Sequence, residues 1–180
     1  MAWEPYTEQQ WDELTDAAPA IARGMAWISG PPSESEAELG AFVKFVEDSY
    51  LHLPGGNESL LTRLVNTVHG KLEAGIDMPG GDAMTDGLQA ARKASALLEL
   101  YPDVAQAREA RQWLLAIGRR VAEAKKEGGL FGIGGEQVSA PETDTLMYLA
   151  DALGFEERPD DVTPGDPGQG DPDMGGKSTG

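Results

Sequence analysis

Carboxylates at the starts of two predicted helices are the residues of this sequence whose types and spacing best suit chemistry. Glu36 and Glu38 belong to the first of these starts, and Glu136 and Glu142 lie just before and just inside the second. Hard cations such as Ca²⁺ and Mg²⁺ take several oxygen ligands of this kind. If the two starts converge in the fold, the four glutamates predict a divalent-cation site. The alternative is that each glutamate only closes a capping box at its own helix.

A glycine-rich segment, residues 128–135, lies directly before the second start. Its apolar residues Leu130, Phe131 and Ile133 can dock on the core or on another protein. The segment fails the dinucleotide-binding fingerprint, because Gln137 stands where the third glycine is needed and no strand precedes it. We therefore interpret it as a connection between helices and a candidate partner-binding segment.

No catalytic pattern is complete in this chain. The run Gly175–Ser178 resembles the end of a phosphate-binding loop, but Asp171 stands where that motif requires its first glycine. His52 and His69 are the only histidines, and Asp48 lies at helical spacing before His52. There is no Gly-x-Ser-x-Gly nucleophile elbow. We predict no catalytic residue and no enzyme; an enzyme whose site assembles from residues far apart in the sequence is the third alternative.

Charge and composition exclude several classes of protein. The 180 residues include 14 basic and 31 acidic ones, for a net charge of −17. This balance argues against nucleic acid and anionic membranes as partners, since both select clustered Lys and Arg. No apolar run approaches the roughly 20 residues of a membrane span, the N-terminus does not read as a signal peptide, and there is no cysteine. We expect a cytoplasmic protein with no membrane insertion.

Apolar periodicity near 3.6 residues and the absence of alternating segments predict an all-α fold. We expect one compact domain of six to seven helices over residues 1–155 and a disordered Asp/Gly/Pro-rich acidic tail over residues 156–180. Residues 73–87 are expected as an irregular connector. The expected helix starts or caps are Thr7, Pro19, Ser33 or Ser35, Asn57, Gly87, Asp103 and Ser139.

Apolar stripes predict which residues of these helices are buried. The clearest stripes are Leu39, Phe42, Val43, Val46 and Tyr50; Ala107, Ala110, Leu114, Ile117 and Val121; and Leu146, Leu149, Ala150 and Leu153. Gly154 is expected to end the last helix.

The two halves of the chain echo one another. Placing Ser35 on Ser139 pairs Glu38 with Glu142. It also pairs four apolar positions, Phe42, Val43, Phe45 and Val46 with Leu146, Met147, Leu149 and Ala150. An internal two-fold repeat and a chance match between helical periods both explain this echo.

The order of helix, loop, Val-Ser-x-x-Glu and a helix ending in Leu-Gly resembles the TerB-like family of tellurite-resistance proteins. The resemblance covers roughly residues 19–155 and rests on Val121–Ala124, Val138–Ser139, Glu142 and Ala152–Gly154, with a weaker copy at Met25–Ala26, Ser35 and Glu38. It implies an all-helical, cytoplasmic, non-enzymatic protein of the response to tellurite, phage or chemical stress, with acidic residues that bind metal.

Our first hypothesis is therefore a non-enzymatic stress-response protein that binds a divalent cation through Glu38 and Glu142, with Glu36 and Glu136 in support. The alternative is a helical scaffold or adaptor without metal. It would bind a basic protein partner through residues 128–135 or through the acidic tail.

Overall fold

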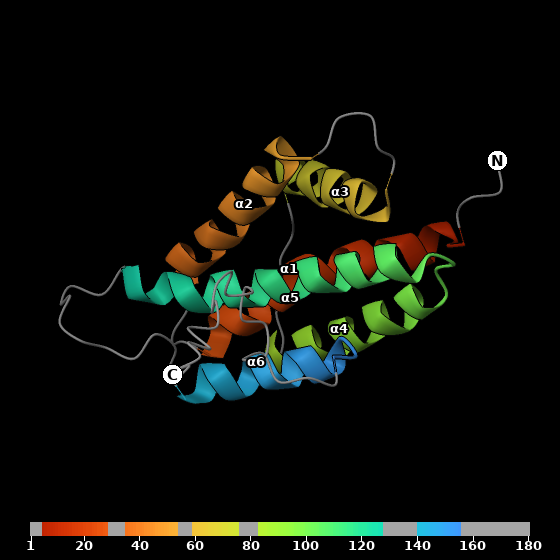
Figure 1. Cartoon of the computed structure of the whole chain (residues 1–180). Helices are drawn as coiled ribbons and strands as arrows, with labels where there is room; N and C mark the ends of the chain where they lie inside the picture. The colour runs from red at the N-terminus through yellow and green to blue at the C-terminus, as the bar shows by residue number, and fades with distance from the viewer. Residues whose placement is uncertain (1–4, 29–34, 54–58, 76–82, 128–139, 156–180) are drawn as a thin grey trace, which may run out of the picture.

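Six helices make up the described part of the chain, which is residues 5–28, 35–53, 59–75, 83–127 and 140–155 of a computed structural model (Figure 1). These residues contain no strand, so the predicted all-α fold is confirmed. The helices are α1 (Glu8–Ile28), α2 (Ser35–Leu51), α3 (Leu60–Ala74), α4 (Ala83–Glu99), α5 (Val104–Glu127) and α6 (Ala140–Ala152).

Two helices, α1 and α5, form the centre of the fold. Each of them packs against all five other helices. In Figure 1, α2 and α3 lie above this pair, and α4 and α6 lie below it. The predicted stripe of α5 is confirmed, because its five members are all buried: Ala107, Ala110, Leu114, Ile117 and Val121.

The predicted start of α1 at Thr7 is confirmed, whereas the predicted start of a second helix at Pro19 is wrong. The amide of Gln10 donates to Oγ1 of Thr7 at 3.2 Å, and the amide of Thr7 donates to Oε1 of Gln10 at 2.8 Å. This is the expected capping box. The chain does not start a new helix at Pro19, which lies buried inside α1. Proline removes one helical hydrogen bond, and burial of the surrounding face, including Ala18 and Ile21, offsets that loss.

Helices α1 and α4 approach closely where two glycines face each other. A Cβ atom on Gly24 would lie 2.8 Å from the carbonyl oxygen of Ala83. A Cβ atom on Gly87 would lie 2.9 Å from the carbonyl oxygen of Ala20. Since real Cβ contacts are longer, any larger residue would push the two backbones apart.

Polar caps fix the starts of α3 and α5. Ser59 caps α3 by accepting from the amide of Thr62 at 3.1 Å, so the predicted cap at Asn57 is wrong. Oε1 of Gln106 accepts from the amide of Leu60 at 2.8 Å and satisfies another free donor of α3. One carboxylate oxygen of Asp103 accepts from two amides of the first turn of α5, at 3.0 and 3.1 Å.

The ends of α4 and α6 refine the predicted boundaries. Helix α4 begins at Ala83, four positions before the predicted Gly87, so the predicted connector is shorter than expected. Gly154 has a φ of 79° and follows α6, where it was predicted to end the helix. The predicted buried stripe of α6 is confirmed: Leu146, Leu149, Ala150 and Leu153.

None of the helices in the described ranges combines the length and the apolar character that crossing a membrane requires. The predicted tail, residues 156–180, lies outside the described residues.

Candidate functional site

The helix ends that carry the predicted acidic residues lie at one end of the molecule. In Figure 1, α1 and α5 end, and α2 and α6 begin, toward the left. Helices α2 and α6 each pack against both α1 and α5. The two halves share this order of elements, but α2 packs more extensively on α5 than α6 does on α1.

Burial agrees at three of the four paired apolar positions, and in the fourth pair Phe45 is partly buried whereas Leu149 is buried. Phe42 and Val46 of α2 are buried, as are their counterparts Leu146 and Ala150 of α6. Val43 and Met147, also paired by the sequence echo, are both exposed. In the central helices, Ile21 and Ala26 of α1 are buried, and so are Ile117 and Ala122 of α5.

Glu38 is the predicted ligand with the most unusual surroundings. Only 1% of its surface is exposed, and it shares the buried face of α2 with Phe42 and Val46. Placing a carboxylate in the core is unfavourable unless the charge is compensated. Val43 and Tyr50 were predicted to be buried and are exposed instead. The buried face of α2 therefore differs from the predicted one and includes Glu38.

The remaining predicted ligands are distributed unevenly. Glu36 lies in the same turn as Glu38 but is exposed to solvent. Glu142 belongs to the first turn of α6, and its side chain lies outside the described part of the structure. Glu136 also lies outside the described residues. Within the described ranges, no group of three or more His, Cys, Asp or Glu side chains is placed to hold a metal ion.

The predicted partner-binding residues Leu130, Phe131 and Ile133 lie outside the described residues as well. The helix that leads to them, α5, is described up to Glu127.

The two histidines belong to structural contacts at the end of α2. Nδ1 of His52 lies 2.7 Å from the carbonyl oxygen of Asp48, whereas the carboxylate of Asp48 lies 3.4 Å from Nζ of Lys44. The ring of His69 stacks on Tyr50, with 4.1 Å between centroids. The side chains of His52 and Asp48 therefore do not form the metal-binding pair that their spacing allowed.

An open groove of about 450 Å³ lies between α2 and α5. Helix α2 contributes Lys44, Phe45 and Asp48, and α5 contributes Arg120 and Glu123. The remaining lining residues are small: Ala41, Ser49 and Ala124.

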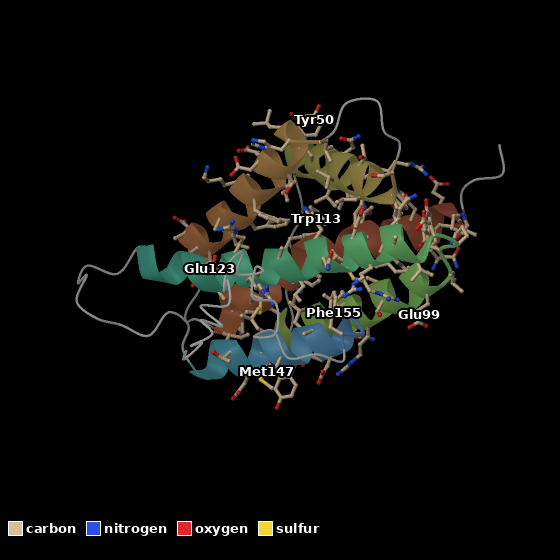
Figure 2. All side chains as sticks on the ribbon, in the orientation of Figure 1. Tyr50, Glu99, Trp113, Glu123, Met147 and Phe155 are labelled. Atoms are coloured by element: carbon tan, nitrogen blue, oxygen red, sulfur yellow. The ribbon has the colours of Figure 1, made fainter. Side chains whose placement is uncertain are left out.

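The aromatic floor of this groove is held by contacts between the two helices. Figure 2 shows Trp113 of α5 in the space between α5 and α2. Its ring stacks on Phe45 with 6.2 Å between centroids, and its Nε1 donates to Oγ of Ser49 at 3.1 Å. The Ser49 hydroxyl in turn donates to the carbonyl oxygen of Phe45 at 2.7 Å. These contacts fix Phe45 in place.

Four exposed charges form the rim of the groove. Nζ of Lys44 lies 3.4 Å from Asp48, and a guanidinium nitrogen of Arg120 lies 3.5 Å from Glu123. Each pair belongs to a single helix, so each wall presents one cation and one anion. The sequence predicted neither this groove nor its rim, because Lys44 and Arg120 are far apart in the chain. The available signal was Trp113, since a large aromatic residue in a helix indicates packing against another element.

Comparisons with protein-family models, with curated proteins and with solved structures give no match for this chain. The TerB-like resemblance therefore stays a prediction, and the function is inferred from the described side chains.

Proposed function

We propose that this chain is a non-enzymatic binding protein of the TerB-like, stress-response type, and that it binds a divalent cation, Ca²⁺ or Mg²⁺. The observation that carries this proposal is the burial of Glu38 at the end of the molecule where α2 and α6 begin. In this proposal Glu38 is the central ligand, and Glu142 and Glu136, which the sequence echo assigns to the start of the second half, are the further ligands.

The physical argument concerns the charge of the Glu38 carboxylate. Glu38 is 1% exposed, so its carboxylate is largely removed from bulk water, and coordination to a cation is one way to stabilise a charge in that position. The amides of the first turn of α2 favour a negative charge at the same place. Glu38 acting only as a helix cap would use the same amides. The two roles of Glu38, helix cap and cation ligand, therefore differ in whether a metal ion is needed.

Glu36 has a different part in the proposed site. Because its side chain is exposed, it approaches a cation from the solvent side. Its removal should therefore weaken binding less than removal of Glu38.

Isothermal titration of the chelator-treated full chain with Ca²⁺ and with Mg²⁺ tests the proposal. We expect saturable binding to the wild type and at least roughly tenfold weaker binding to Glu38→Gln and to Glu142→Gln, as when a metal ligand is weakened. Glu47→Gln is the matched control, since Glu47 is exposed on the same helix. Circular dichroism of each variant verifies that it is folded.

The cation proposal fails if the wild type gives neither heat nor a thermal shift at millimolar metal. It also fails if folded Glu38→Gln binds as tightly as the wild type.

The second candidate is a metal-independent adaptor that binds a protein partner. It is favoured by the groove, which the last turns of α5 line through Arg120 and Glu123. The chain continues from there into residues 128–135. Partner binding that survives treatment with a chelator distinguishes this function from the first.

A further inference from the structure

We propose that the groove between α2 and α5 is a docking site for an amphipathic helix of a partner protein. The partner helix carries an apolar side chain together with one acidic and one basic residue about one turn apart. This inference rests on the adaptor function and is independent of the cation site.

The shape of the groove fits such a partner. Its volume of about 450 Å³ lies within the range of about 300–1,000 Å³ of small-molecule pockets, which is room for side chains of a helix laid across it. Its walls are the helices α2 and α5, and a groove between helices is a common receptor for the apolar face of a third helix.

The floor supplies an apolar anchor site. Phe45 is flanked by the small side chains Ala41 and Ala124, which leave room for an incoming aliphatic group. The stacking of Trp113 and the hydrogen bonds of Ser49 already hold this floor. A preordered floor loses little conformational entropy when a partner binds.

The rim determines the charge of the partner. Lys44 and Arg120 provide two cations, and Asp48 and Glu123 provide two anions, so the groove is locally neutral in a chain with a net charge of −17. A uniformly acidic or basic helix would meet a like charge on both walls. A helix with one charge of each sign pairs with both walls in one orientation.

Exchange of these ion pairs is inexpensive. Lys44 and Asp48 have side chains that are 74% and 53% exposed, so their present pair is solvated and weak. Breaking this pair to form ion pairs with a partner helix therefore costs little free energy. The charges therefore select the partner and its orientation, while the apolar contact at Phe45 supplies most of the affinity.

The test is selection from a displayed library of helical peptides on the full-length wild type, followed by binding measurements on variants. Ala41→Trp fills the groove, and Ala96→Trp makes the same change at an exposed position of α4. We expect enriched peptides with an apolar residue between opposite charges. Their affinity should fall at least roughly tenfold, about 1.4 kcal/mol, in Ala41→Trp and stay unchanged in Ala96→Trp.

A charge exchange gives a second test that does not depend on tolerance of a large side chain. The double variant Lys44→Asp/Asp48→Lys keeps an ion pair on α2 but reverses its direction. Selected peptides should bind this variant more weakly, and the same peptides with their two charges exchanged should recover affinity.

Peptides that bind wild type and Ala41→Trp equally, and that ignore the charge exchange, would overturn the groove as the site while leaving the adaptor function standing. A selection that enriches no peptide on the wild type would overturn both.

Discussion

The ammonium group of Lys71 on α3 lies 2.7 Å from Oδ1 of Asp16 on α1. The same nitrogen donates to Oγ1 of Thr15 at 2.7 Å and lies 3.3 Å from Oδ1 of Asp12. A single cation thus holds three side-chain oxygens of α1 against α3. The Thr15 side chain is fully buried, whereas the two aspartates are exposed.

Replacing Lys71 by methionine should lower the free energy of unfolding by about 1 kcal/mol. This is the size of one good hydrogen bond with two exposed ion pairs. Urea denaturation measures the change, and Lys93→Met, at an exposed position of α4, is the control. Equal losses in the two variants would mean that the contact to α1 contributes nothing specific.

Replacing glycine by alanine should change the stability of the protein in opposite directions at two pairs of glycines, depending on how closely each pair is packed. Gly24→Ala and Gly87→Ala should each destabilise the protein by about 1–3 kcal/mol, because the new methyl group meets backbone oxygen. Gly40→Ala and Gly70→Ala, at helical positions with no atom within 4 Å of the new methyl group, should stabilise it by about 0.5–1 kcal/mol. Thermal denaturation of the four variants tests the pattern; stabilisation by Gly24→Ala would contradict the packing.

Ionisation of Tyr6 should lower the stability of the protein at alkaline pH. Burial, with a smaller contribution from Tyr101, raises the pKa of the Tyr6 phenol to about 12, and Arg111 opposes this shift. A raised pKa favours the folded state while the phenol is protonated. That contribution is complete below the unfolded pKa of about 10 and is lost as pH rises toward about 12.

The variant Tyr6→Phe separates this effect from general alkaline unfolding. At neutral pH it should cost about 0.5–1.5 kcal/mol, for the lost hydrogen bond from the phenol to the carbonyl oxygen of Leu97. That carbonyl keeps the amide of Leu100 as a partner. The difference in melting temperature from the wild type should shrink above pH of about 10; a constant difference would argue against the raised pKa.

Asp103 should contribute at the acidic end. The backbone amide of Gln106, followed by its side-chain amide, holds the pKa of Asp103 below its ordinary value. The contribution is therefore present above the unfolded pKa of about 3.9 and is lost as pH falls through the lower folded pKa. Asp103→Ala should melt below the wild type at neutral pH and approach it in acid. Parallel melting curves down to acidic pH would rule out this role.

The elements that the sequence predicted best are those whose burial follows one clear stripe. Helices α5 and α6 have apolar residues in strict helical register, and packing against α1 buries them as predicted, Leu114 and Leu149 among them. Their boundaries carry standard signals, an aspartate before the first turn of α5 and Gly154 after α6.

The predictions that failed involve residues whose place depends on tertiary contacts. Pro19 reads as a helix start in the sequence, and only the packing around α1 allows it inside a helix. Glu38 was predicted to be a ligand and was not predicted to be a core residue, because a charged side chain is not expected in an apolar stripe. The groove depends on the angle between α2 and α5, which no local pattern encodes.

The central position of both α1 and α5 has a consequence for synthesis. The first four helices emerge from the ribosome before α5, which every one of them contacts in the final fold. Until about residue 127 has been translated, the apolar faces of α1 to α4 have no complete partner surface. A nascent chain of this protein is therefore expected to bind chaperones during that interval and to fold only after α5 has left the exit tunnel.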